Sequence, residues 1–448
     1  MAEQPIAGKY ELNEFVVKSL TPDRETKPID LKSQVHSWTL IESIKRGNIY
    51  GSATIYDATG VFYDFPLKGQ ELLDIVYTDT KGVERREELF IYSISDIAPA
   101  KEDDDNMLEY RINFVSWGKF YSDRFRIRRS FSKGDGTHYE VHEQVQKLFD
   151  DYYIGRDGKG TKKTIEISGT VGEQKIIIPN LKPEDAMHML SRRSYSEDYK
   201  SQSYRFFENR DGYYFANMEE HLDFSANKDQ YFFYTSTPAD NSPEGELLKL
   251  QRVISMSYGT TVDTMRDMNV GKYTRKFYEL DIVNRTHKAY EFDWIGANIP
   301  DSEYIDYYRD AYNTDFPNFE IGHSDDMLRS HMNRWHRTYA IKDYPDADAP
   351  NAPGLRPKPY YGDIHTHKAA NFLFFDEYKI NLSIYGTNEV VAGDVIRLDM
   401  PEFKTKHKVD EERTGYWLVE TINNEFYENT YTQKLTVSRI GLNPRTEE

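Results

Sequence analysis

Two stretches of this chain share one order of strand-like segments, and this duplication most constrains the fold. Residues 378–440 read YKINLSIYG, VVAGDVIRLDM, a charged loop and GYWLVETINNEFYENTYTQKLTVSRIG. The earlier stretch reads GSATIYD, PLKGQELLDIVYTD and LFIYSISDIAPAKEDDDNMLEYRINFVSW. In each, a glycine (Gly69 or Gly393) follows an apolar residue by two positions and leads into an acidic residue and an alternating strand. We interpret both glycines as turn residues that begin equivalent strands, and not as parts of a ligand site.

Composition agrees with a large, sheet-rich protein. The chain has 448 residues, of which 38% are hydrophobic, so it can bury sizeable cores in two to four domains. Its 35 Tyr and 24 Phe are too many for a disordered chain. Aromatic rings with one wet edge suit β-sheets and large interfaces, which favours a component of an assembly over a compact monomeric enzyme.

Charge and cysteine usage exclude several classes of protein. The formal net charge of −18 argues against a general binder of nucleic acid or of anionic membranes. The chain has no cysteine, which excludes disulfides, thiolate metal sites and cysteine nucleophiles. The N-terminus has no apolar signal core, and no apolar run approaches about 18 residues, so we expect neither classical secretion nor membrane insertion.

Taken in order, the chain alternates between strand-rich regions and insertions. Residues 1–118 read as a first β domain, in which the acidic run at 102–106 is predicted to be a solvated hairpin loop. Residues 119–245 read as an α+β insert. Helical periodicity begins at Val141, Pro183 opens a second helix with Ala186, Met189 and Leu190 facing inward, and an aromatic hairpin turns near Asp211 and Gly212.

The remaining residues are predicted to form a second β domain that is split by an excursion. This domain is assembled from residues 246–300 and 361–448. Residues 301–360 contain a predicted helix around 327–335 and a proline-rich linker, and a further helix is expected at 363–376.

A basic stripe is conspicuous in this acidic chain. Arg124, Arg126 and Arg128 share one face if their segment is extended. The stripe could dock an acidic neighbouring subunit or form local ion pairs, and the sequence leaves both open.

Candidate chemical sites are weak. The Gly/Lys-rich loop at 155–163 lacks the spacing of a phosphate-binding loop and is interpreted as an exposed turn. Acidic pairs are expected by chance among 75 acidic residues, and the histidines lack the four-residue spacing of a helical zinc site. We therefore predict no catalytic residue, cofactor or metal; the candidates considered were Glu143 with Asp150, Asp325 with Asp326, and His323, His331, His336, His365 and His367.

The order of these parts resembles the baseplate central hub proteins of contractile-tailed bacteriophages, the late control protein family. The parts that carry the resemblance are GSATIYD with GQELLDIVY, HEQVQKLFDDYY, the aromatic hairpin, and YKINLSIYG with VVAGDVIRL and GYWLVETINNEF. They cover most of the chain, and the specificity lies in their order and duplication. The resemblance implies an α+β, mainly β fold: two related tube-type β-barrel or sandwich domains, an inserted α+β domain and a second irregular excursion. Residues 301–361 match nothing in the family.

The resemblance also implies a function and partners. Such a hub is a homotrimer whose six similar domains form a pseudo-sixfold ring in the virion tail baseplate, made in the host cytoplasm. The ring joins the hexameric tail tube, or a tube-initiator protein, to the trimeric central spike, with baseplate wedge proteins as possible further partners, and leaves a channel through which DNA passes without specific binding. The alternatives are a tail-associated carbohydrate- or peptidoglycan-degrading enzyme, for which aromatic residues would supply sugar-stacking platforms, and the tube-adaptor part of a related secretion spike or tailocin.

Overall fold

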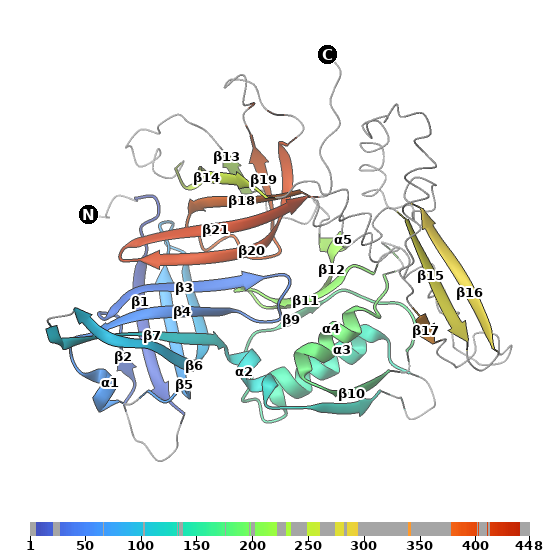
Figure 1. The fold of residues 1–448 in the computed structure, drawn as a ribbon, viewed down its shortest axis with the longest axis horizontal. Helices are drawn as coiled ribbons and strands as arrows, with labels where there is room; N and C mark the ends of the chain where they lie inside the picture. Colours follow the sequence, from blue (N-terminus) through green and yellow to red (C-terminus); the bar gives the residue numbers. More distant parts are fainter. Residues whose placement is uncertain are drawn as a thin grey trace.

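Strands of both duplicated stretches lie in one large sheet (Figure 1). Within the described part of the chain, thirteen strands join it in the order β14-β18-β21-β20-β3-β4-β7-β6-β5-β1-β2, with β13 beside β19 and β19 beside β20. The first copy supplies β1 (Glu11–Ser19), β2 (Ile29–Asp30), β3 (Val35–Ser43), β4 (Tyr50–Asp57), β5 (Glu71–Thr78), β6 (Glu84–Lys101) and β7 (Asp104–Ser116). The second supplies β13 (Gln230–Phe233), β14 (Val253–Tyr258), β18 (Tyr378–Tyr385), β19 (Val395–Asp399), β20 (Gly415–Tyr427) and β21 (Thr430–Arg439).

The structure is a computed structural model. It describes residues 6–20, 27–65, 67–101, 104–131, 133, 138–174, 176–196, 198, 202–221, 230–233, 249–259, 274–281, 285–293, 339–341, 378–400, 402, 410 and 413–439. The histidines at 323–367, the acidic pair at 325–326 and the helices expected at 327–335 and 363–376 lie outside these residues.

The strand pairing confirms the duplication. The order β3-β4-β7-β6-β5-β1 in the first copy matches β14-β18-β21-β20-β19-β13 in the second. The irregularities match as well: the β6·β7 register shifts after Ile91, and the β20·β21 register shifts after Val419. The copies differ at their last strand, because β1 runs antiparallel to β5 whereas β13 runs parallel to β19.

Alternation of buried and exposed side chains gives each copy its own core. Along β4 every second residue is buried, as expected for a strand with one face turned inward. The core of the first copy includes Phe15, Trp38 and Ile112, and that of the second includes Ile380 and Trp417.

The hairpin of β6 and β7 is longer than the sequence predicted. Strand β6 continues to Lys101 and β7 begins at Asp104, with these two residues paired across the hairpin. The prediction of a loop was therefore wrong for residues 104–106. Pairing between the two strands can continue into a segment whose composition by itself reads as a loop.

The α+β insert contains the predicted helices and hairpin. Its elements are α2 (Trp117–Asp123), β8 (Ile127–Ser130), α3 (Val141–Phe149), the π-helix η1 (Asp150–Gly155), β9 (Ile165–Ile167), β10 (Ile177–Leu181), α4 (Pro183–Ser191), β11 (Tyr204–Glu208), β12 (Tyr213–Asn217) and α5 (Met218–His221). Pro183 is the first residue of α4, and Ala186 and Leu190 are buried as predicted. Met187 is buried in place of Met189, which is only partly buried against the same core.

Four described elements belong neither to the large sheet nor to the insert. Strands β15 (Thr274–Asp281), β16 (Thr286–Asp293) and β17 (Tyr339–Ile341) form a separate sheet. The short helix α1 (Val61–Asp64) follows β4. Among the described residues, no helix is long and apolar enough to span a membrane.

Candidate functional site at the junction of the two copies

The two copies meet where β20 of the second pairs with β3 of the first. Seven antiparallel residue pairs form this junction, from Thr421 with Ser43 to Tyr427 with Ser37. Near its end the Trp38 ring stacks on Phe426 with 3.6 Å between centroids, and each residue is only 1% exposed. The junction therefore combines a backbone ladder with a buried aromatic pair and turns two sheets into one.

The insert contributes one arginine to this junction, where it contacts residues of both copies. Arg210 lies in the turn between β11 and β12, and its side chain is fully buried. Its guanidinium Nε donates to Glu42 Oε1 at 2.8 Å. Its other acceptors are the Tyr77 hydroxyl at 3.3 Å, Asn388 Oδ1 at 3.3 Å, the Tyr431 hydroxyl at 3.2 Å and the carbonyl of Val390. One side chain thus ties the insert to both copies.

The charge of Arg210 is stabilised by the residues around it. Burial by itself lowers the pKa of Arg210, but Glu42 and the two tyrosines more than offset this, so its pKa is raised above the ordinary value. Burial also raises the pKa of Tyr77 to about 12 and raises that of Tyr431, which keeps both hydroxyls neutral near pH 7.

A second ionic cluster anchors the same turn to the first copy. Lys163 Nζ lies 3.2 Å from Glu87 Oε2 on β6 and 3.3 Å from Glu208 Oε1 on β11. Glu208 Oε2 accepts a hydrogen bond from Ser116 Oγ at 2.6 Å. Burial lowers the pKa of Lys163, but the two carboxylates raise it further, so this lysine stays charged.

The loop that leads to Lys163 is only partly an exposed turn. Residues 156–159 are exposed, as the sequence predicted, whereas Gly155 and Gly160 are buried. The loop therefore has a structural role in delivering Lys163 to the cluster.

The repeat glycines lie in equivalent turns. Gly69 has φ +74° and Gly393 has φ +102°, a backbone conformation that favours glycine. After each, a carboxylate accepts a hydrogen bond from the backbone of the turn: Glu71 from Lys68 N at 2.8 Å, and Asp394 from Val391 N at 2.9 Å.

The three arginines of the basic stripe are exposed on the insert. Arg128 lies on β8 and Arg126 directly precedes this strand. Arg124 has its guanidinium over the Tyr121 ring, 4.2 Å from the centroid. Arg128 Nε donates to Asn180 Oδ1 at 2.9 Å. Among the ion pairs between described residues, none involves these three arginines, so their charge remains open to a partner.

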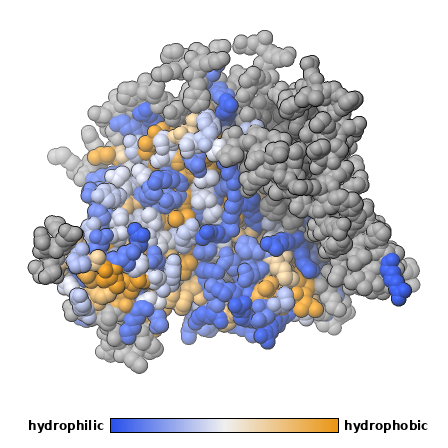
Figure 2. Space-filling view, viewed as in Figure 1, coloured by the Kyte–Doolittle hydropathy of each residue, from blue (hydrophilic) through white to orange (hydrophobic). Residues whose placement is uncertain are grey.

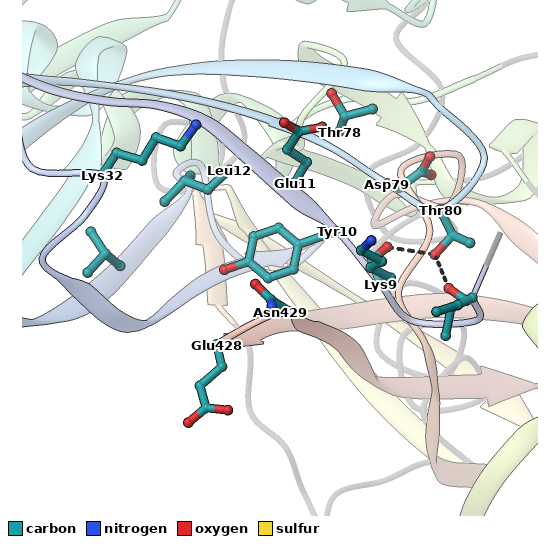
Figure 3. A pocket seen from close by; sticks show the side chains of 12 residues that line it. Lys9, Tyr10, Glu11, Leu12, Lys32, Thr78, Asp79, Thr80, Glu428 and Asn429 are labelled. Carbon is teal, nitrogen blue, oxygen red and sulfur yellow. Dashed lines mark hydrogen bonds between the residues drawn. The ribbon is translucent and has the colours of Figure 1, made fainter. Parts of the chain in front are cut away.

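A pocket lies between the first copy and the β20–β21 turn of the second (Figure 3). This pocket of about 640 Å³ is lined by the start of β1, the β5–β6 turn and the β20–β21 turn. Thr80 Oγ1 donates to the carbonyls of Lys9 at 2.7 Å and Ile6 at 3.2 Å, which ties the N-terminal segment across it. Charges of both signs line it, including Lys32 and Glu428, so it does not resemble a site for one charged ligand.

The acidic pair considered from the sequence has structural roles. Glu143 Oε2 accepts the backbone N–H of Glu140 at 2.9 Å in the capping box of α3. Asp150 accepts a hydrogen bond from Gln146 at 2.8 Å. No group of three or more metal-ligating side chains occurs among the residues that the structure describes.

Sequence reasoning found the hairpin but missed its central residue. Arg210 precedes the predicted Asp211–Gly212 turn, and an arginine in a turn reads as a solvated charge. The one available signal was the set of aromatic residues on both arms, which marks a hairpin that is buried along its length.

Comparison by sequence finds no relative: no protein-family model matches the chain, and no curated protein matches it. Comparison of folds does find similar structures. A tail protein from Neisseria meningitidis MC58 aligns with 96% of this chain and 97% of its own, at a TM-score of 0.52 and 9% identity. The 43 kDa tail protein of prophage MuSo2 from Shewanella oneidensis aligns with 96% of this chain and 100% of its own, at a TM-score of 0.50 and 8% identity. At such identities the likeness establishes the fold, which is the mainly β fold of these tail proteins.

Proposed function

We propose that this chain is the structural hub of a contractile tail of the phage type. Three copies would form a ring with pseudo-sixfold symmetry, which joins the hexameric tail tube to the trimeric central spike in the virion baseplate. The protein would work by assembly and symmetry matching, without chemistry of its own.

The junction of β20 with β3 carries this proposal. It joins two related β units edge to edge within one chain, so that one chain already supplies two neighbouring members of a ring. Three chains that continued the same arrangement would place six related units around one axis. The likeness to two tail proteins over nearly the whole chain supports the same context.

Net charge supports a conduit for DNA. At −18, the chain would repel a nucleic acid rather than bind it, so a genome could pass through the ring without adhering. A trimer whose inner surface proved neutral or basic would remove this part of the proposal.

Mass in solution and direct imaging test the proposal. Light scattering on the purified full chain should give the mass of three chains, against 52.6 kDa for one. Electron microscopy of the same sample should show a threefold ring with a central hole. A monomer at every concentration, with no complex formed with tube or spike proteins, would overturn the hub.

The enzymatic alternative has its own assay. Purified chain incubated with peptidoglycan should release no soluble fragments above a heat-inactivated control. Fragment release by a monomer would replace the hub with a tail-associated hydrolase.

A further inference from the structure

Strand β20 has two neighbours along one edge. Residues 415–418 pair with β19 of its own copy, and residues 421–427 pair with β3 of the other copy. The second half of β20 thus extends beyond β19 and forms the junction.

Strand β6 is the equivalent of β20, and it extends in the same way. Its residues 84–91 pair with β5, but residues 92–101 continue past the end of β5. Among the described strands, only β7 pairs with this second half. Figure 1 shows the hairpin of β6 and β7 reaching the left-hand side of the molecule.

Strand β14 is the equivalent of β3, and it also has an edge that no described strand occupies. Strand β3 pairs with β4 on one side and β20 on the other, whereas β14 pairs with β18 alone. The register supports the equivalence: β3·β4 shifts between Val35 and Ser37, and β14·β18 shifts between Val253 and Ser255.

Exposure distinguishes the closed junction from its open counterpart. In the closed junction, Phe426 and Trp38 are each 1% exposed. At the equivalent positions, Pro99 of β6 is exposed and Met256 of β14 is half-buried. Ile97 is 52% exposed in the same part of β6. Figure 2 shows apolar residues gathered at the lower left, where Figure 1 places α1, β2 and the end of this hairpin.

We propose that residues 95–98 of β6 pair antiparallel with residues 257–259 of β14 in a second copy of this chain, by repeating the β20·β3 junction between subunits. This inference rests on the proposed trimer and specifies which edges close it. A strand edge left open next to apolar side chains favours pairing with another chain, and the duplicated junction identifies that chain as a second copy.

The two copies fix the register of the proposed pairing. Glu425 pairs with Thr432 on β21 and with Thr39 on β3. Strand β6 has one extra residue at a second register shift, between Ser95 and Ala98, which β20 lacks. When this residue is allowed for, Ala98 takes the place of Glu425 and Ser257 takes the place of Thr39. Ala98 of one subunit should therefore face Ser257 of the next. Pro99 follows directly and has no N–H, so it can only accept in the ladder and we expect regular pairing to end there.

Ala98 and Ser257 are also well placed for a disulfide. At the ends of the closed junction, Ile44 N donates to the carbonyl of Glu420 and Glu428 N donates to that of His36. Pairs along an antiparallel ladder alternate between hydrogen-bonded and non-hydrogen-bonded. The pair of Thr39 and Glu425 lies an odd number of residues from each of these hydrogen-bonded pairs, so it is a non-hydrogen-bonded pair, for which Cα atoms lie about 4.5 Å apart. This separation is within the range that a disulfide can span.

Cysteine cross-linking tests the register on a clean background, since the chain has no native cysteine. The test variant is Ala98→Cys with Ser257→Cys, oxidised with copper phenanthroline, which removes two electrons and two protons for each disulfide formed. Non-reducing gels should show the mass shifting from that of one chain to those of two and three chains. Thr39→Cys with Glu425→Cys is the matched control, which should form the same bond within one chain and add no mass. Ala98→Cys with Ser255→Cys, two residues out of register, should cross-link far less.

Hydrogen exchange on the unaltered chain provides a second test that does not depend on the folding of variants. Amides on the open edges of β6 and β14 should gain protection when the protein associates and lose it on dilution to monomers. A trimer without the Ala98–Ser257 cross-link and without this protection would overturn the proposed pairing and leave the trimeric hub standing. A monomer under all conditions would overturn the hub itself.

Discussion

Replacing Arg210 with methionine should destabilise the protein by about 3–5 kcal/mol, the usual cost of removing one partner from a buried ion pair. Methionine keeps much of the apolar stem and removes the guanidinium. The Tyr431 hydroxyl retains another donor, Gln433 Nε2 at 3.0 Å, whereas the neutral Asn388 Oδ1 loses a hydrogen bond of 3.3 Å. The loss therefore falls mainly on Glu42.

Glu42 would be left as a buried carboxylate with few donors. It is 0% exposed, and its remaining bonds would be those from the backbone N of residue 210 at 3.1 Å and from Asn424 Nδ2 at 3.5 Å. A loss of about 4 kcal/mol corresponds to a fall in melting temperature on the order of 10 °C for a cooperative unit of 150–250 residues. Hydrogen exchange should show the opening at β3 and β20 first, because Glu42 lies in that ladder.

A double-mutant cycle separates this effect from general loss of packing. Arg210→Met combined with Glu42→Gln should cost less than the sum of the single changes, by about 2 kcal/mol, because each single change leaves the other group without its partner. The matched control is Arg86→Met. Arg86 pairs with Asp74 at 3.4 Å but is 56% exposed, so we expect at most about 1 kcal/mol. If Arg210→Met cost no more than this control, the buried arginine would not be what holds the junction.

Three further predictions concern single features. Burial raises the pKa of Glu219 from 4.5 to about 8. The stability that its neutral form contributes is therefore complete below pH 4.5 and declines by roughly 5 kcal/mol as the pH rises to about 8, at about 1.4 kcal/mol per pH unit. Urea titrations of Glu219→Gln should lack this decline, and a pH profile equal to that of the unaltered chain would refute the assignment. We propose that the basic stripe docks an acidic partner. The double variant Arg126→Glu with Arg128→Glu should then slow association with tube or spike protein about tenfold at low salt and leave the melting temperature unchanged. An association rate equal to that of the unaltered chain would contradict this proposal. Gly69→Ala should reduce the free energy of unfolding by about 1–2 kcal/mol because of its left-handed backbone, and by more because the new Cβ would lie 3.1 Å from a carbonyl oxygen. Gly82→Ala, which has the same backbone conformation but open space around it, should show the backbone cost alone. Equal melting temperatures for the two variants would argue against the close contact.

Local patterns were sufficient for the elements and for the duplication. Alternating apolar residues predicted most strands of both copies, and the helical period predicted α3 and α4, because each pattern depends on residues a few positions apart. The Asp211–Gly212 turn was readable for the same reason. The longer β6–β7 hairpin was not, since the acidic start of β7 has the composition of a loop and its strand conformation depends on pairing with β6.

The sequence by itself therefore determined what kind of units this chain builds, and that it builds two of them. Only the tertiary structure decided how the units are joined. Alternation fixes which face of a strand turns inward, but it does not say which other strand lies along its edge, because backbone hydrogen bonds are the same for every partner. The pairing of Ser43 with Thr421 and the burial of Arg210 against Glu42 connect residues far apart in the chain. Which residues form such long-range contacts depends on which strand edges come together once both sheets have formed.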